Sequence, residues 1–293
     1  MRLISVQTDH GEALGVVDEG RWLAAVDLVP DGPATMAALI EGGVGALRAL
    51  EAAAANGSIA DRGGSIEDAD LLAPLPHPGK IVAIGRNYRD HTTEEGVAPP
   101  AAPLVFAKWP SSVVGPGAEV CWDPALTRQV DYEAELAVVI GRRARNVSVG
   151  DALDHVLGYT CLNDVSARDI QFGDGQWVRG KSLDTFCPMG PALVTADEVG
   201  DPQDLAITCS VGGERLQDAR TSSMFFSVAA IISYCSRSFT LEAGDVIATG
   251  TPGGVGAFRD PPRYLGDGDR VTVEIERIGR LANTCRVVAE AVA

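Results

Sequence analysis

The feature that most constrains the fold of this chain is the repeated alternation, from Ile81 onward, of short apolar runs with Gly, Pro and Asp turns. The runs include KIVAIG, LVFAKW, YEAELAVVIG, HVLGYTCLND, LAITCSVGG, DVIATG and RVTVEIER. Runs of this length between turn residues indicate strands, because a helix needs a longer segment with a period of about 3.6 residues. The pattern predicts a protein of the α+β class that is mainly β, with a mixed β-sheet or β-roll body.

The first part of the chain has a different pattern. Three short strand-like runs precede an Ala-rich stretch with helical propensity, MAALIEGGVGALRALEAAAANG, which Gly residues interrupt. The following LLAPLPHPGK favours extended chain. We therefore expect a small N-terminal α+β domain over residues 1–70 and a larger domain over residues 71–293. We expect one clear helix in the larger domain, at SSMFFSVAAIISYCSRS, capped by Ser222 or Ser223 and buried against the sheet.

Composition excludes several classes of partner. The formal net charge of −16 and pI near 4.6 argue against binding to nucleic acids or anionic membranes. No apolar run approaches the roughly 20 residues needed to cross a bilayer, and the first residues do not resemble a signal peptide, so a cytoplasmic location is expected. The six cysteines are scattered without a C-x-x-C pair, which indicates reduced core thiols and neither a disulfide framework nor a zinc site.

Two glutamates stand on the run DYEAELAVVI, where a core strand normally carries apolar side chains. Side chains alternate between faces along a strand, so Glu133 and Glu135 point the same way, with Cα atoms roughly 6.5 Å apart. Two like charges on an apolar strand require a cation between them or a retained proton. Asp164, at the end of GYTCLND, could complete an oxygen site suited to Mg²⁺ or Mn²⁺. The alternative is a solvated strand face beside a turn-forming Asn163-Asp164 pair.

The strand-like run KIVAIG ends at Gly85, and the polar segment GRNYRDHTTEEG begins at that residue. If this segment forms a helical turn, His91 and Glu94 lie on one face and can act as a general acid/base pair. The alternative is a surface loop with an incidental histidine. The next residues, GVAPPAAP, have the character of a lid that orders over a substrate and excludes water.

Two further segments place polar groups beside strand-like runs. In GQWVRGKSLDTFCPMGP, the amine of Lys181 could lie near the metal and stabilise developing negative charge, with a solvated lysine as the alternative. In ATGTPGGVG, backbone N–H groups and the Thr251 hydroxyl could hold a carboxylate. The latter segment is not a dinucleotide-binding fingerprint, because AFRDPPR follows it instead of a helix.

Taken in this order, these segments resemble the fumarylacetoacetate hydrolase family in its short bacterial form, similar to acylpyruvate and 2,4-diketo-3-deoxy-L-fuconate hydrolases. The matching stretches are IGRNYRDH, YEAELAVVIG, NDVSARDIQ, GQWVRGKSLDTFCPMGP, SMFFSVAAIISYCSRSFTLEAGDVIATGTPGGVG and GDGDRVTVEIERIG. Several long motifs in the same order are far more specific than any one of them. The resemblance implies the family fold, a β-sandwich roll of mixed sheets, and it implies a homodimer.

The resemblance also implies a role for particular residues. It assigns Glu133, Glu135 and Asp164 as ligands of Mg²⁺ or Mn²⁺, His91 and Glu94 as a water-activating dyad on the lid, Lys181 as the lysine facing the substrate, and Arg168, Gln171 and Thr251 as substrate contacts.

The leading hypothesis is a metal-dependent hydrolase that cleaves a carbon–carbon bond in a small 2,4-dioxo acid, of the acylpyruvate or diketo-deoxy sugar acid type. The same site would also serve an oxaloacetate decarboxylase or a hydroxymuconate or heptadienedioate isomerase, because any reaction through an enolate benefits from it. A non-catalytic oxo-acid-binding protein and a structural Ca²⁺ site are the remaining alternatives.

Overall fold

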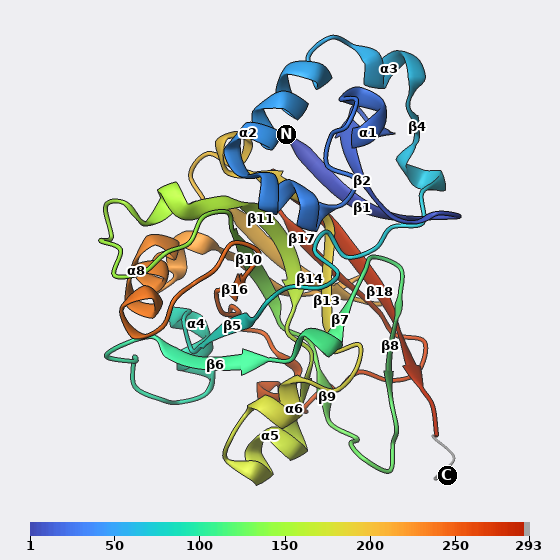
Figure 1. Cartoon of the computed structure of the whole chain (residues 1–293). Helices are drawn as coiled ribbons and strands as arrows, with labels where there is room; N and C mark the ends of the chain where they lie inside the picture. Colours follow the sequence, from blue (N-terminus) through green and yellow to red (C-terminus); the bar gives the residue numbers. More distant parts are fainter. Residues whose placement is uncertain (290–293) are drawn as a thin grey trace.

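A computed structural model of the chain describes residues 1–289, and a large mixed sheet runs through most of it (Figure 1). The strand order is β4-β3-β2-β1-β13-β11-β10-β16-β5-β6, with β7 paired to β13. The bounds are β1 Arg2–Thr8, β2 Gly11–Asp18, β3 Arg21–Ala24, β4 Gly64–Ser65, β5 Ile81–Gly85, β6 Leu104–Lys108, β7 Val113–Val114, β10 Ala134–Ile140, β11 Val156–Asn163, β13 Cys187–Thr195 and β16 Val246–Ala248.

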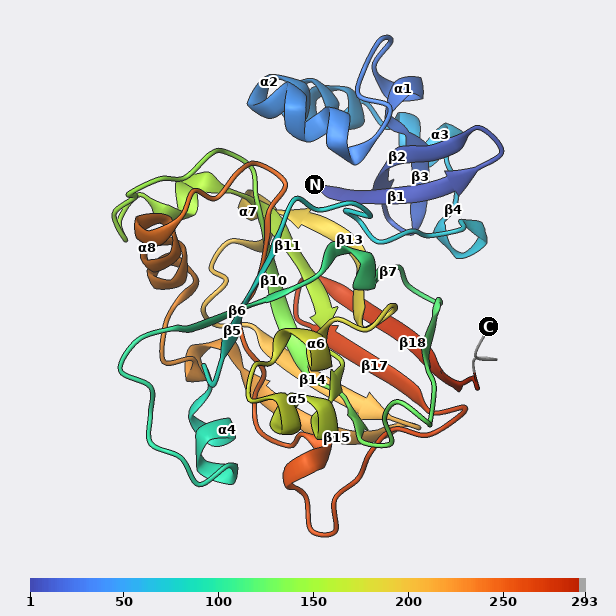
Figure 2. The same ribbon diagram turned by 60° about the horizontal axis from the view of Figure 1, so that its bottom comes forward.

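A second sheet, of order β15-β14-β17-β18-β8, packs against the body of the first (Figure 2). Its strands β14, β17 and β18 contact β10, β11 and β13. The bounds are β8 Glu119–Trp122, β14 Ala206–Val211, β15 Glu214–Arg220, β17 Arg270–Ile275 and β18 Gly279–Val287, and a small separate sheet joins β9 Val130–Asp131 to β12 Ser166–Ala167. The prediction of a mainly β, α+β fold with mixed sheets packed as a sandwich is confirmed.

The helices are mostly short and lie around these sheets (Figures 1 and 2). The Ala-rich stretch forms the longest of those described, α2, which bends at Gly43, where φ is 60°. The bounds are α1 Ala25–Leu28, α2 Met36–Ala54, α3 Ser58–Arg62, α4 Arg89–Glu94, α5 Arg168–Asp174, α6 Val178–Lys181, α7 Ala196–Val199 and α8 Val228–Ser238.

The start of α8 differs from the prediction. The hydroxyl of Ser227, and not that of Ser222 or Ser223, caps the helix by accepting a hydrogen bond from the Ala230 N–H at 3.2 Å. The residues before it cannot join the helix because their backbone is bonded elsewhere. Phe225 N–H donates to the Asn87 carbonyl at 2.7 Å, and the next N–H donates to the Asn87 side chain.

Strand β10 lies at the centre of the molecule, and its two faces belong to different cores. Leu136, Val138 and Ile140 pack in the core that contains residues of the second sheet and of α8. Ala137 and Val139 pack in the core that contains residues of α2. Because every residue of β10 is buried, polar groups at its start must find their partners within the protein.

The N-terminal elements continue the large sheet. Strand β1 pairs antiparallel with β13, so hydrogen bonding runs without a break from β4 into the body. The division into domains 1–70 and 71–293 stays a prediction, and residues 290–293 lie outside the described part of the chain. None of the helices within the described residues is long and apolar enough to span a bilayer. All six cysteines are free, and five are buried.

Candidate functional site

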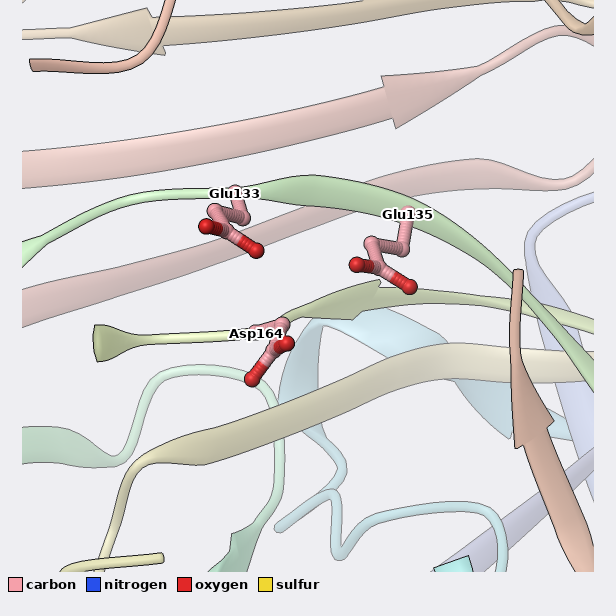
Figure 3. Close-up of side chains that lie close together, drawn as sticks. All are labelled: Glu133, Glu135 and Asp164. Atoms are coloured by element: carbon pink, nitrogen blue, oxygen red, sulfur yellow. The ribbon is translucent and has the colours of Figure 1, made fainter. Parts of the chain in front are cut away.

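Three carboxylates come together where β10 begins and β11 ends. Glu133 directly precedes β10, Glu135 is its second residue, and Asp164 directly follows β11. Because these strands pair antiparallel, their ends lie side by side, and the Asp164 N–H donates to the Glu133 carbonyl at 2.9 Å. Figure 3 shows both glutamates projecting from one strand toward Asp164. All three side chains are buried, and one oxygen atom of each lies within 4.8 Å of the others.

The environments of the two glutamates differ. Burial raises the pKa of Glu135, and the charges of Asp164 and Glu133 raise it further. Burial also acts to raise the pKa of Glu133, but the cationic side chains of Lys181 and Arg168 outweigh it and lower that pKa to about 2. The Gly250 N–H donates to Glu135 Oε2 at 2.8 Å. Glu135 is therefore the carboxylate whose charge lacks a full protein counter-charge.

Two buried lysines compensate the charge of Asp164. Lys181, the last residue of α6, places Nζ 2.6 Å from Glu133 Oε2 and 2.8 Å from Asp164 Oδ2. Lys108, the last residue of β6, donates to Asp164 Oδ1 at 2.7 Å and to the Lys181 carbonyl. Lys181 thus lies among the predicted metal ligands. Sequence analysis does not identify Lys108, although a lysine that ends the apolar run LVFAK is its signal.

Arg168 and Gln171, on the first turn of α5, lie on the other side of Glu133. Arg168 Nη1 lies 2.7 Å from Glu133 Oε1 and donates to Gln171 Oε1 at 3.0 Å. Arg168 Nε donates to Asp131 Oδ2 at 2.8 Å. The Asp131 carboxylate also accepts hydrogen bonds from the N–H groups of Gly256 and Ala257. The guanidinium is therefore fixed between two carboxylates.

His91 is held between two carboxylates by helix α4. Its Nδ1 lies 2.7 Å from Glu94 Oε1, and its Nε2 lies 3.1 Å from Glu95 Oε1. Burial acts to lower the pKa of His91, but the hydrogen bonds to these two carboxylates outweigh it and raise the pKa to about 9. The imidazole is therefore charged at neutral pH in this conformation. Sequence analysis does not identify Glu95, whose signal is its i,i+4 spacing from His91.

The loop after β16 closes the site. Gly254 N–H donates to Glu94 Oε2 at 2.7 Å, and this position requires glycine because φ is +102° and a Cβ would lie 2.1 Å from the Leu216 carbonyl oxygen. Thr251 is buried, and its Oγ1 accepts a hydrogen bond from Gln217 Nε2 at 2.8 Å. Gln217 also accepts from the backbone N–H that begins β10, so it ties the loop to the carboxylate strand.

The predicted site residues surround one cavity. Seven of the nine line it, and the other two, Glu94 and Asp164, contact lining residues. Its free space is about 20 Å³, which admits about one water molecule, so the site is closed in this conformation. A hollow of about 790 Å³ lies elsewhere, along residues 66–77 and 113–118, and carries none of these groups. Chemistry, and not volume, therefore identifies the site.

The carboxylate triad fits a hard divalent cation. Its donors are all oxygen, their atoms are close enough to share one ion, and the charge of Glu135 is the one that protein cations balance least. Lys181 and Arg168 hold Glu133 in its ionised form, which is the form that binds a cation. These three residues could therefore bind a divalent metal ion.

Comparison with known proteins identifies the family of this chain. Residues 80–286 match the family described as fumarylacetoacetate (FAA) hydrolase C-terminal. The chain belongs to the fumarylacetoacetate hydrolase family. Among members of this family, the mitochondrial oxaloacetate tautomerase fahd2 of Xenopus laevis is 42% identical over 290 residues, covering 97% of this chain and 89% of that protein.

Solved structures of the fumarylacetoacetate hydrolase family share the fold. A fumarylacetoacetate hydrolase from the psychrophilic Exiguobacterium antarcticum superposes with a TM-score of 0.84 at 38% identity, covering 98% of this chain and 100% of that one. A 2-hydroxyhepta-2,4-diene-1,7-dioate isomerase from Mycobacterium marinum superposes with a TM-score of 0.76 at 35% identity, covering 99% and 100%. The predicted family fold is confirmed, and an enzymatic activity of this family is supported.

The predicted hydrolytic cleavage of a carbon–carbon bond is wrong. Similar proteins are named for oxaloacetate tautomerisation and for dienedioate isomerisation, reactions in which no water is consumed and no bond between carbons breaks. The motifs could not separate these chemistries, because the carboxylate triad, the His91–Glu94 pair and Lys181 suit any reaction through an enolate. Hydrolysis further requires a water placed against a second carbonyl, and no residue pattern in the chain specifies that placement.

Proposed function

We propose that this chain catalyses the keto–enol tautomerisation of a small 2-oxo dicarboxylic acid of the oxaloacetate type. The observation that carries the proposal is the position of His91, a proton carrier, in a closed cavity beside three buried carboxylates. Tautomerisation moves one proton between carbon 3 and the 2-oxo oxygen and consumes no water, so the site need not position a water molecule for it. The similarity to an oxaloacetate tautomerase supports the same reaction.

His91 is the residue proposed to exchange a proton with carbon 3. Its Nδ1 is bonded to Glu94, whose second oxygen is held by the Gly254 N–H, so the ring is fixed. Its Nε2 lies 3.1 Å from Glu95 Oε1 and is the nitrogen that can exchange a proton once Glu95 moves away. Such positioned acid/base groups contribute roughly 10²- to 10⁴-fold to a rate. His91 removes the proton from carbon 3 and returns it to the 2-oxo oxygen, so the enol forms and the imidazole ends in its starting protonation state.

Cationic and polar groups stabilise the negative charge that develops on the 2-oxo oxygen. Lys181 forms an ion pair with Glu133 of the carboxylate triad, and Gln171 lies beside Arg168 in the cavity lining. We assign Thr251 to the carboxylate next to the 2-oxo group, because Thr251 lines the cavity and its hydroxyl, which accepts a hydrogen bond from Gln217, keeps its own hydrogen to donate. A divalent cation held by the triad, Mg²⁺ or Mn²⁺, would supply a Lewis acid for the same charge.

Isomerisation of a hydroxyheptadienedioate-like acid is the second candidate function, favoured by the similarity to the Mycobacterium marinum isomerase. It uses the same proton carrier and moves the proton between carbons that lie farther apart.

The test follows the enol and keto forms of oxaloacetate by NMR, with Mg²⁺ or Mn²⁺ present and with a chelator as the control. We expect the protein to accelerate interconversion, and we expect His91→Gln to slow it by about 10²- to 10⁴-fold. His155→Gln, at a half-buried histidine whose ring nitrogen lies 3.3 Å from the Arg142 carbonyl, is the matched control because this histidine does not line the cavity. Release of pyruvate would assign the protein as a decarboxylase, and no acceleration by the wild-type protein would contradict the proposal.

A further inference from the structure

Arg86 has an unusual backbone conformation at the edge of the cavity. It directly follows Gly85, the last residue of β5, and its φ is +56°, in the left-handed region that L-residues rarely adopt. The guanidinium lies over the ring of Trp177, 5.7 Å from its centroid, and both side chains line the cavity. Backbone conformations of this kind cluster at ligand-binding sites. Arg86 is thus held at the cavity by its backbone and by an aromatic face.

Glu95 fills the space between Arg86 and His91. Its Oε2 accepts a hydrogen bond from Arg86 Nε at 2.7 Å, and its Oε1 lies 3.1 Å from His91 Nε2. The Glu95 side chain is only 12% exposed. A carboxylate of the protein therefore connects a guanidinium to the imidazole nitrogen that we assign to proton transfer.

This connection occupies the nitrogen through which His91 would act as a base. With Glu94 on Nδ1 and Glu95 on Nε2, neither ring nitrogen of His91 has a free lone pair, and a general base needs one. The remaining free space, about 20 Å³, does not admit a four-carbon acid. Glu95 must therefore leave its position before a substrate can bind and before His91 can accept a proton.

We propose that Arg86 binds the second carboxylate of a dicarboxylic 2-oxo acid, and that Glu95 holds this place until the substrate displaces it. Arg86 contacts Glu95 through Nε, and within residues 1–289 its guanidinium has no other hydrogen-bond or ion-pair partner. A guanidinium can bind a carboxylate through two parallel hydrogen bonds, and the Trp177 face keeps its plane oriented.

Displacement of Glu95 by the substrate carboxylate also releases Nε2 of His91. Recognition of the second carboxylate and activation of the proton carrier are then one event, so an acid without that carboxylate leaves the site locked. This inference rests on the proposed tautomerase function and deepens it, because it makes Arg86 the residue that selects dicarboxylic over monocarboxylic acids.

The test compares two acids that differ in the terminal group alone, oxaloacetate and 2-oxobutanoate, whose methyl group replaces the second carboxylate. The rate at which carbon 3 exchanges its protons for deuterium is measured by NMR with Mg²⁺ present, after subtraction of the uncatalysed rate. We expect Arg86→Met to slow exchange of oxaloacetate by about 10- to 100-fold and to leave that of 2-oxobutanoate unchanged. Equal rates of oxaloacetate exchange in the wild-type protein and in Arg86→Met would overturn the assignment.

Arg89→Met is the matched control, because Arg89 lies only three residues further along the chain but stacks on Phe225, 5.5 Å from its ring centroid, and does not line the cavity. It is expected to leave both exchange rates unchanged. If the wild-type protein exchanges neither acid, the proposed function fails. The inference is then decided by calorimetry, since Arg86→Met must still weaken binding of oxaloacetate, and equal binding by both proteins overturns it.

Glu95→Gln tests the other half of the inference. It keeps the size of the side chain and removes its charge, so it weakens the hold on both Arg86 and His91. We expect exchange of 2-oxobutanoate to rise by about 10-fold, so that the preference for oxaloacetate falls. A loss of exchange on both acids, with an unchanged melting temperature, would show that Glu95 itself carries the proton and would overturn its role as a place-holder.

Discussion

The charge of His91 links the stability of the fold to pH. Its pKa is raised from 6.5 to about 9 in the folded protein by Glu94 and Glu95, despite burial. A raised pKa contributes stability that is complete below the unfolded value, near 6.5, and is lost as pH rises through about 9. We therefore expect wild-type protein to exceed His91→Gln in free energy of unfolding below about pH 6.5, by at most about 3 kcal/mol.

Urea unfolding at a series of pH values, with a chelator present, measures this difference. The gap between the two proteins should shrink steadily from about pH 6.5 to about pH 9. His155→Gln, at a half-buried histidine outside the cavity, is the control variant. A gap of constant size across this range would contradict the assigned cause of the raised pKa.

Glu135 is predicted to oppose stability without metal and to support it with metal. Burial and the charges of Asp164 and Glu133 disfavour its ionised form, so Glu135→Gln removes an unfavourable charge. We expect this variant to melt at a higher temperature than wild-type protein in chelator, and to bind Mn²⁺ at least about 10-fold more weakly in calorimetry. Glu242→Gln, at an exposed acid, is the control. A higher melting temperature than that of wild-type protein both in chelator and with Mn²⁺ would show that the triad does not hold the metal.

At the scale of elements, the sequence predicts features that follow from the alternation of apolar and polar residues along a segment. It misses features that depend on contacts between distant segments. The alternation around β10 places Glu133 and Glu135 together because side-chain direction follows from the backbone alone. The start of α8 is misplaced because Asn87, far away in the chain, binds the backbone of the preceding residues. Lys108 is missed for the same reason, since its partners lie at the ends of β11 and α6. Motif spacing likewise identifies the enolate chemistry that the family shares and cannot separate the different reactions of its members.

The glycine-rich loop after β16 should tolerate no side chain at Gly254. Its φ is +102° and an added Cβ would lie 2.1 Å from a backbone oxygen of β15, so Gly254→Ala must move the loop that holds Glu94. We expect a loss of about 2 to 4 kcal/mol in urea unfolding, together with a lower rate of tautomerisation. Gly57→Ala separates the cost of the backbone conformation from the cost of the close contact, because Gly57 has a φ of +82° but open space around it. It should lose only about 1 to 2 kcal/mol. Equal losses in the two variants would show that the close contact is unimportant.

At the scale of the whole molecule, the net charge of −16 opposes the approach of an anionic acid. Cationic side chains offset this repulsion near the cavity. Lys108, Lys181 and Arg168 are buried around the carboxylates, and Arg86 lies at the edge. The same charge distribution leaves the outer surface acidic, so an exposed apolar area on it is notable. Such an area lies on β6, the last strand of the large sheet, and continues to Trp109.

The homodimer implied by the family resemblance stays a prediction, and β6 is the surface we assign to it. Leu104, Val105 and Trp109 are 40%, 36% and 55% exposed along an edge strand, an arrangement that invites pairing with a second copy. We expect light scattering to give about twice the chain mass of 30.6 kDa, and we expect Val105→Lys to reduce it to a single chain. Val149→Lys, at an exposed valine away from β6, should remain dimeric.

The position of β6 connects the dimer to the site. The strand carries Phe106, which lines the cavity, and Lys108, which holds Asp164. A partner on its outer edge would restrain both, so the monomeric Val105→Lys protein should also bind Mn²⁺ more weakly than the dimer. A monomer with full metal affinity would show that β6 needs no partner to hold the site, and an unchanged dimer mass would place the interface elsewhere.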